Sequence, residues 1–309
     1  MNEKCIRNPV GRLLLFQPLA KLFLKTLVAI FFLFVYPDPA AAQHDSISVI
    51  KARWINKKIT RGVTWKHCWF TDLYGAHQNI DILEIKPRRK LLFGIGYEKK
   101  ELVETSDFGV RAHALAAING NFFDVKNGGS VDYLKVNKEL ISEDQLQNGE
   151  RARHQRAAIA IRGCNLSIVK WDGSPDWQKA LPYETIMSTG PLLIDGGREE
   201  ALDTAAFNRL RHPRSAVAVT NKGRILLITV DGRNERSAGM SLYELSHFLR
   251  WIHAEDAINL DGGGSTTLWV EGEPADGVVN YPSDKKTWDH TGERKVANAL
   301  LVIKKGNQK

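Results

Sequence analysis

The chain has 309 residues and a formal net charge of +8. Acidic residues are scattered among the basic ones, and no dense Lys/Arg block with interleaved aromatic residues occurs, so the composition does not predict nucleic-acid binding. The moderate excess of positive charge fits an anionic small substrate or an anionic cell-wall polymer.

Residues 1–42 have the layout of a secretory signal peptide. Five basic residues precede an apolar run over 26–36, and Ala40-Ala41-Ala42 supplies small residues before Gln43. The apolar run is shorter than the ~20 residues that span a bilayer. We therefore expect cleavage after Ala42 and a secreted or periplasmic protein. The alternative is an uncleaved N-terminal segment, which would then be the only contact with a membrane.

Residues 43–309 contain no Pro/Ser/Gly-rich linker, no internal repeat and no low-complexity tract, so we expect one domain. Removal of residues 1–42 takes away five basic and two acidic residues and leaves a net charge of +5. Cys68 and Cys164 remain, and in an oxidising compartment they either pair or stay as free buried thiols.

Hydrophobic periodicity and turn residues predict the following elements in chain order. A capping box at Ser241 and Glu244 begins the best-defined helix, which runs to about His253. Ser106 and Asp107 are predicted to cap a shorter helix that ends near His113. Strands are predicted within 63–86 and over 91–97, 114–118, 157–161, 166–171, 215–220, 224–230, 257–261, 268–270 and 296–303. The predicted fold class is α+β: a largely antiparallel mixed sheet with a few packed helices, in a single domain.

The most informative segment is the glycine run that follows Asp261 between two apolar strands. Gly262, Gly263 and Gly264 lose much backbone entropy on folding, which a chain accepts where its backbone turns sharply or another group comes very close. Bare N–H groups beside Ser265 and Thr266 suit an anionic ligand such as phosphate. The alternative is a glycine-rich hairpin that Asp261 caps.

Four predicted strands end in polar, turn-prone clusters: Asn119-Gly120-Asn121, Ser188-Thr189-Gly190-Pro191, Asp231-Gly232-Arg233 and Asp261-Gly262-Gly263-Gly264. Each cluster alone is typical of an ordinary turn. Four of them next to unusually apolar strands predict a shared site, because sites are often built on loops at strand ends.

Two arginines are candidates for binding phosphate through the planar guanidinium group. Arg214 precedes a predicted strand, and Arg233 lies on a predicted site loop, where a salt bridge with Asp231 is the alternative role. Phe122 and Phe123 are expected to stack on a sugar or to join the core. The sequence contains no Gly-x-Ser-x-Gly, P-loop or dinucleotide-binding pattern. This narrows the enzyme classes to carboxylate-driven chemistry on a phosphate- or sugar-bearing substrate.

Seven blocks of the sequence resemble the phosphodiester glycosidase domain family, in the same order and over roughly residues 63–304. The resemblance implies hydrolysis of a sugar-1-phosphodiester at the glycosidic bond. Asn121 stands where we expect glycine in many members, so the local turn differs. The blocks are 116–124, 188–193, 214–220, 230–233, 239–245, 259–268 and 296–299.

The implied catalytic carboxylate is Asp261, with Asp231 as second choice. The predicted substrate-binding residues are Asn119, Asn121, Asp124, Thr189, Arg214, Arg233, Gly262, Gly263, Gly264, Ser265 and Thr266. No cofactor is predicted, and a divalent cation is left open. Two other classes compete: a secreted, non-catalytic binder of an anionic glycan, and a phosphodiesterase that cleaves the P–O bond.

Overall fold

The computed structural model describes residues 39–306, and the described residues from His44 onward form one compact unit. Most of the predicted signal peptide lies outside the described residues. The described helices are α2 (Pro39–Ile50), α3 (Thr105–Arg111), α4 (Trp177–Ala180), α5 (Ala206–Arg209) and α6 (Leu242–Trp251), with 3₁₀ turns at Arg153–Gln155, Gly263–Ser265 and Ala275–Gly277. None of the described helices is long and apolar enough to cross a membrane.

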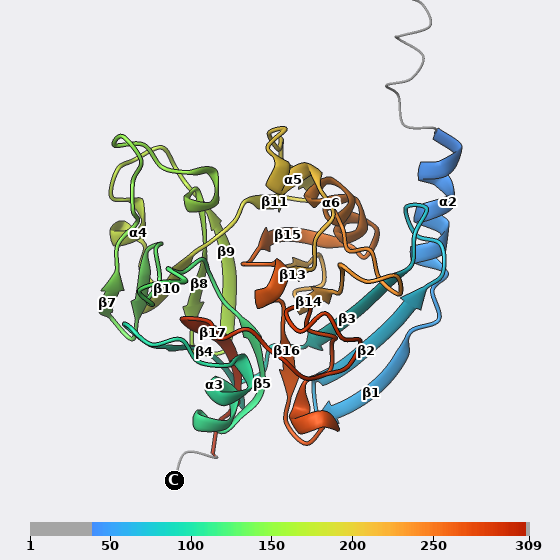
Figure 1. Ribbon diagram of the computed structural model, residues 1–309. Coiled ribbons are helices and arrows are strands. Elements are labelled where there is room, and N and C mark those ends of the chain that lie inside the picture. Colours follow the sequence, from blue (N-terminus) through green and yellow to red (C-terminus); the bar gives the residue numbers. More distant parts are fainter. Residues whose placement is uncertain (1–38, 307–309) are drawn as a thin grey trace, which may run out of the picture. The chain divides into compact units, whose positions relative to one another are not determined.

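Three antiparallel sheets make up the fold (Figure 1). The first has eight strands in the order β1 (Ile55–Thr60), β2 (Val63–Phe70), β3 (Gln78–Ile85), β14 (Ile225–Val230), β13 (Arg214–Thr220), β15 (Ala254–Asn259), β11 (Leu192–Asp195) and β12 (Arg198–Glu199). The second has the order β7 (Glu139–Ser142), β6 (Leu134–Val136), β10 (Thr185–Ser188), β8 (Ala157–Arg162) and β9 (Asn165–Lys170). The third has the order β16 (Leu268–Val270), β5 (Ala114–Asn119), β17 (Asn298–Lys304) and β4 (Leu91–Tyr97).

This architecture confirms the predicted α+β class. The two predicted hairpins are β8–β9 and β13–β14, with Gly163 and Gly223 at positive φ in their turns. One helix cap was predicted wrongly. The N-cap of α3 is Glu104 without a side-chain cap, because the helix begins at Thr105 and so includes Ser106 and Asp107.

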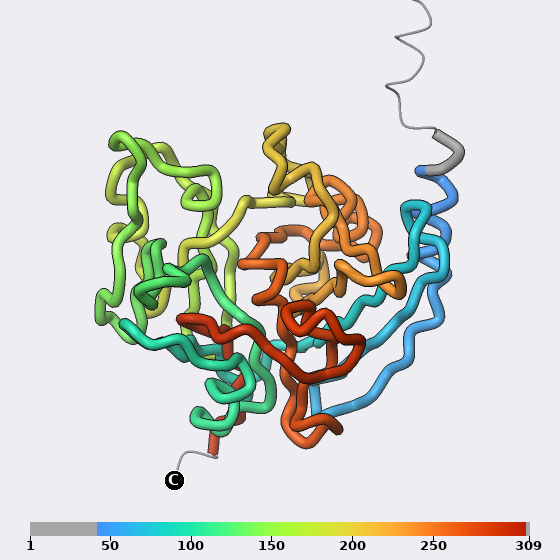
Figure 2. The backbone as a smooth tube through the Cα atoms, viewed as in Figure 1, coloured from blue at the N-terminus to red at the C-terminus, as the bar shows by residue number. Residues whose placement is uncertain are grey.

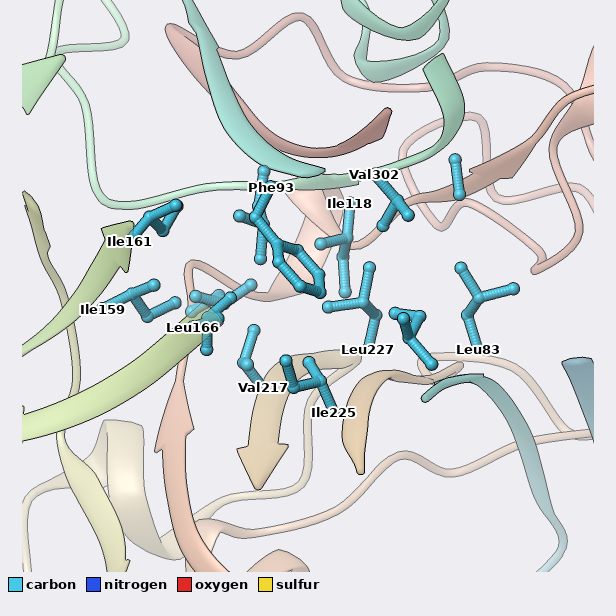
Figure 3. Packing of buried hydrophobic residues seen from close by; sticks show 14 of the residues in the cluster. Leu83, Phe93, Ile118, Ile159, Ile161, Leu166, Val217, Ile225, Leu227 and Val302 are labelled. Atoms are coloured by element: carbon cyan, nitrogen blue, oxygen red, sulfur yellow. The ribbon is translucent and has the colours of Figure 1, made fainter. Parts of the chain in front are cut away.

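The largest hydrophobic core lies where the three sheets meet. Figure 3 shows Leu227 of the eight-stranded sheet close to Ile118 of the four-stranded sheet, and Ile159 and Leu166 of the five-stranded sheet on the same core. Burial of each such side chain contributes about 1.5–3 kcal/mol. The other face of the eight-stranded sheet packs against α6, whose Leu242, Leu245, Phe248 and Leu249 are fully buried.

Helix α6 begins as its sequence predicts. Ser241 accepts a hydrogen bond from the Glu244 N–H, and the Glu244 carboxylate accepts one from the Ser241 N–H, which forms the capping box. The helix leads directly into β15 and the glycine segment (Figure 2). The packing of α6 on the sheet therefore fixes β15, the strand that leads to Asp261.

Both described cysteines are free, and Cys68 is buried. Burial raises the pKa of its thiol to about 11. The thiol is therefore protonated and unreactive at neutral pH.

Candidate functional site

The glycine segment is a crossover between two sheets and not a hairpin. Strand β15 before it pairs with β13 and β11, whereas β16 after it pairs with β5. A 3₁₀ turn at Gly263–Ser265 reverses the chain between them, and Gly263 has a φ of 63°. This is the left-handed region that glycine adopts without strain.

The expected phosphate cradle of bare N–H groups is not formed. The N–H of Gly262 donates to Asp261 Oδ1, that of Gly263 to the Pro213 carbonyl, and that of Ser265 to the Gly262 carbonyl. The Thr266 N–H donates to the Gly263 carbonyl. These four donors already have acceptors within the protein, so they are not free to bind an anion.

Two arginines and an aspartate come close to the glycines, and the nearest group to a Cβ at Gly264 would be Asp284 Oδ1, at 1.9 Å. A Cβ at Gly263 would lie 2.8 Å from Arg233 Nη2, and a Cβ at Gly264 would lie 2.3 Å from Arg294 Nη2. Arg294 is also paired with Asp284, with 2.8 Å from its Nη2 to Asp284 Oδ1. The glycines thus let two guanidinium groups approach the backbone immediately after Asp261.

Asp261 is a partly exposed carboxylate at the end of this sheet. Its Oδ1 accepts the Gly262 N–H at 2.9 Å. Burial raises the pKa of this carboxyl to about 6, and the nearby Ser265 hydroxyl, the Gly262 N–H and the charge of Arg294 offset part of the rise. Asp261 therefore titrates near neutral pH in a place that a ligand can reach.

Asp231, the second predicted carboxylate, is buried and fully engaged. Its oxygens accept hydrogen bonds from Asn79 Nδ2 at 2.8 Å, from Asn280 Nδ2 at 3.0 Å and from the Tyr281 N–H at 3.0 Å. Burial, with the nearby carboxylate of Asp81, raises its pKa to about 7. Asp231 therefore joins β3 to the segment after β16, and Asp261 is the more accessible of the two carboxylates.

Side chains of Asn119, Asn121 and Thr189 join three of the four clusters, and the fourth lies beside them because Arg233 Nη2 would be 2.8 Å from a Cβ at Gly263. Asn119 Nδ2 donates to the Asp261 carbonyl at 2.7 Å, and Asn121 Nδ2 donates to the Ser188 carbonyl at 3.0 Å. Thr189 Oγ1 donates to the Asn259 carbonyl at 3.1 Å. All three side chains are buried and bonded internally, so they hold the site together and do not face a substrate.

Arg214 was predicted to bind phosphate, but its position indicates a structural role. Its Nε donates to the Met240 carbonyl, and its Nη2 donates to the carbonyls of Phe207 and Leu210. The guanidinium lies 4.8 Å from the ring centroid of Phe207 and is fully buried. Arg214 therefore holds the 207–210 segment, which includes most of α5.

Arg233, by contrast, is exposed, and within residues 39–306 it forms no ion pair with Asp231. Asp124 caps its own turn: it accepts hydrogen bonds from the Asn127 side-chain amide and from the N–H groups of Asn127 and Lys126, which lower its pKa. The hydroxyls of Ser265 and Thr266 are buried without a well-formed hydrogen bond. Of the predicted binding residues, Arg233 is the side chain most open to a substrate.

Asp132 and His154, like Arg294, were not predicted from the sequence to be site residues. His154 Nε2 lies 3.2 Å from Asp132 Oδ1, which also accepts Gln155 Nε2 at 3.0 Å. The Asp132 carboxylate is close enough to Asp261 to raise the pKa of Asp261. Neither residue belongs to a recognisable motif, and 22 positions separate them in the chain, so no local signal links them.

A cavity of about 330 Å³ lies beside this pair, with Phe122, His154, Pro191 and Phe207 in its lining. Phe122 and His154 have ring centroids 4.8 Å apart, while Phe123 is buried in a core cluster. Phe122 therefore lies where a ring could stack on a ligand, and Phe123 belongs to the core. In the described part of the chain, no three His, Cys, Asp or Glu side chains are grouped to hold a metal ion.

Comparison with known proteins gives a consistent result. A family model for phosphodiester glycosidase matches residues 112–303, which is more than half of the chain. The N-acetylglucosamine-1-phosphodiester alpha-N-acetylglucosaminidase of Mus musculus is 28% identical over 61% of this chain and 37% of its own length. The Bos taurus protein of the same name is 30% identical over 54% of this chain and 32% of its own length. The chain therefore spans about a third of these relatives.

Two solved structures share the fold. The zebrafish N-acetylglucosamine-1-phosphodiester alpha-N-acetylglucosaminidase catalytic domain, described as auto-inhibited by its pro-peptide, superposes with a TM-score of 0.61 and 19% identity. The match covers 88% of this chain and 94% of that domain. A hypothetical protein from Synechocystis gives a TM-score of 0.62 at 18% identity, over 82% of this chain and 64% of the other.

Proposed function

The chain belongs to the phosphodiester glycosidase family, and from this we propose that it hydrolyses a sugar-1-phosphodiester at the glycosidic bond. The observation that carries the proposal is Asp261, a reachable carboxylate with two arginines beside the glycines that follow it. Developing positive charge at the sugar carbon and negative charge on the phosphate would each meet a group of opposite sign.

In this reaction a water oxygen forms a bond to the anomeric carbon, and the bond from that carbon to the phosphate oxygen breaks. The sugar leaves with a new hydroxyl, and the phosphate leaves as a monoester. Ionised Asp261 takes the proton from water or stabilises the oxocarbenium-like centre. The phosphate is already a good leaving group, so the scheme requires no strong general acid.

We assign Arg233 and Arg294 to the phosphate, since a guanidinium binds phosphate oxygens in a bidentate geometry. Arg294 is held by Asp284, and Arg233 is exposed. His154, held by Asp132, lines the adjacent cavity with Phe122 and contacts the sugar or its substituent. The proposed reaction uses no cofactor or metal ion. We therefore expect activity to persist when a chelator removes divalent cations.

We further propose that the protein acts after export, on a glycan of the cell envelope or outside the cell. This rests on the signal-peptide layout of residues 1–42 and on the family's sugar-phosphodiester chemistry. N-terminal sequencing of the exported protein tests it, since a chain that still begins at Met1 contradicts cleavage after Ala42.

The deciding experiment is hydrolysis of a synthetic N-acetylglucosamine-1-phosphodiester in ¹⁸O-labelled water. Cleavage at the glycosidic bond places the label on the released sugar, whereas cleavage of the P–O bond places it on the phosphate. Label on the phosphate would make the protein a phosphodiesterase. Binding of the diester without turnover would make it a glycan-binding protein.

A further inference from the structure

A second cavity, of about 620 Å³, lies apart from the residues assigned to the reaction. Its volume is within the range of small-molecule sites. Four of its residues come from β2, β3 and the turn between them, and four come from the 235–236 and 281–288 segments. The lining residues are His67, Trp69, His77, Asn79, Glu235, Arg236, Tyr281 and Trp288.

The register of the eight-stranded sheet explains why a pocket forms here. Trp65, Leu83, Leu227 and Val217 stand in register across four strands and belong to the apolar core or pack against it. Two residues further along, the same face carries His67, Asp81, Thr229 and Ser215 in register. Because side chains alternate with a period of two, both rows lie on the same face of the sheet. This face is apolar in the first row and polar in the second.

Two of these residues form a hydrogen-bonded pair of a buried carboxylate and a partly exposed imidazole. His67 Nδ1 lies 3.1 Å from Asp81 Oδ1, which also accepts the Trp65 Nε1–H at 2.8 Å. Asp81 is completely buried, and its second oxygen has no protein partner in the described part of the chain. His67 itself is partly exposed and lines the cavity. The pair thus fixes an imidazole, capable of donating and accepting hydrogen bonds, at the wall of the cavity.

The remaining walls are aromatic. The rings of Tyr281 and Trp288 are stacked, with centroids 4.2 Å apart and planes 8° apart. Trp69 is 51% exposed and meets His77 edge-on at 5.4 Å. The Trp69 Nε1–H donates to the Arg236 carbonyl at 3.0 Å, which fixes the indole. An exposed tryptophan fixed in place beside a polar cavity is typical of a binding surface.

The charges around the cavity disfavour an anion. Glu235 is in the lining, and the carboxylates of Asp81 and Asp231 lie behind His67 and Asn79. Arg236 is the one permanently charged cation of the lining. A neutral ligand with an apolar face and a rim of hydroxyls matches this combination of aromatic rings, amide, imidazole and carboxylate.

We propose that this cavity binds a neutral saccharide unit. His67, Trp69, His77 and Asn79 precede the segment that matches the family model, so the site uses strands outside that match. The chain between Tyr281 and Arg294 runs from the stacked pair of this cavity to the guanidinium beside Gly264. The saccharide would thus be held next to the loop that serves Asp261. The proposal concerns binding alone and does not depend on hydrolysis.

The test is binding of the full-length protein to an array of neutral and acidic glycans, followed by titration of the best neutral ligand while tryptophan fluorescence is recorded. We expect a neutral glycan to bind, and Trp69→Ala to weaken binding at least tenfold. Trp69→Phe keeps an aromatic face and should retain part of the affinity. Trp171→Ala removes a tryptophan outside this cavity and should leave affinity unchanged. Thermal unfolding verifies that each variant is folded.

Asp261→Asn separates this proposal from the hydrolase proposal, because it should bind the glycan with wild-type affinity whether or not turnover occurs. Three results would overturn the saccharide site. They are binding of no neutral glycan, equal affinity of the folded Trp69→Ala variant and wild type, and tighter binding of AMP or choline than of any neutral glycan.

Discussion

The side chain of Asn119 donates a hydrogen bond to the main-chain carbonyl of Asp261, with 2.7 Å between Nδ2 and the oxygen. Asn119 is the last residue of β5 in the four-stranded sheet, and Asp261 follows the end of β15 in the eight-stranded sheet. Asn119 Oδ1 accepts the Ser215 hydroxyl at 2.6 Å and the Thr267 N–H at 3.1 Å. One buried amide thus connects both sheets on either side of the glycine turn.

We expect Asn119→Asp to destabilise the protein by about 1–3 kcal/mol, because a carboxylate cannot donate to the Asp261 carbonyl and a buried acceptor is left unpaired. Urea unfolding followed by circular dichroism measures the change. Asn221→Asp, at an exposed turn position, is the control and should change stability by less than about 0.5 kcal/mol. Equal stability of the two variants would contradict the role given to Asn119.

Arg214→Lys should lower the free energy of unfolding by about 2–3 kcal/mol. A lysine ammonium cannot reproduce the geometry that reaches the carbonyls of Met240, Phe207 and Leu210 together. The exposed Arg209→Lys on α5 is the matched control. If Arg214→Lys instead loses activity with unchanged unfolding, the original assignment of Arg214 to phosphate binding is restored.

Arg233→Ala should lower activity and leave stability nearly unchanged, the opposite of Arg214→Lys. Its guanidinium is exposed and lies beside Gly263, so its loss should leave the melting temperature within about 2 °C of wild type. We expect kcat/KM for the sugar-phosphodiester to fall by roughly 10- to 100-fold, the size of one lost charged contact. Unchanged kcat/KM would exclude Arg233 from the phosphate site.

The strand-end clusters show what the sequence could predict. Turn residues after apolar strands marked 119–121, 188–191, 231–233 and 261–264 in advance, and the structure brings them together. Their roles could not be predicted, because each depends on a partner distant in sequence. Asn121, for example, bonds to a carbonyl 67 positions away. Short or polar strands such as β1, β7 and β12 escaped prediction because they bury too little apolar surface to show a period.

Gly263→Ala tests whether the positive φ or the crowding of Arg233 matters. The substitution should destabilise by about 1–2 kcal/mol, since alanine is strained at a φ of 63°. The added Cβ also meets Arg233 Nη2, so activity should fall at least tenfold. Gly223→Ala is a close control, with a φ of 66° and open space around the Cβ. It should lose similar stability and keep its activity. Loss of activity in both variants would indicate a general effect of destabilisation.

Stability should decrease from pH 5 to pH 8. Burial raises the folded-state pKa of Asp231 to about 7 and that of Asp261 to about 6, from 3.8. Between pH 3.8 and these folded-state values, the folded protein binds more protons than the unfolded chain. The stabilisation that protonation of the two carboxyls provides is therefore complete below pH 3.8 and is lost as the pH rises through about 6 and 7. The raised pKa of His67 acts in the same direction above pH 6.5. Urea midpoints at constant ionic strength measure the trend, and a midpoint that rises towards pH 8 would contradict it.

The decisive substitution for the proposed chemistry is Asp261→Asn, which keeps the size of the side chain and an oxygen that can accept the Gly262 N–H. If the ionised carboxylate activates water or stabilises positive charge, kcat should fall by about 100-fold or more, while the unfolding midpoint should not fall, because asparagine lacks the charge that burial disfavours. Wild-type kcat should also rise with pH around an apparent pKa of about 6, because activity requires the deprotonated form. The residual activity of the variant should lack this dependence.

Asp107→Asn, on the exposed side of α3, controls for the loss of a surface carboxylate and should match wild type in kcat and in its pH dependence. The measurement is release of phosphomonoester at matched concentrations of folded protein between pH 4.5 and pH 8. Near-normal turnover by Asp261→Asn would leave this carboxylate with only the capping of the glycine turn, because asparagine caps turns nearly as well as aspartate.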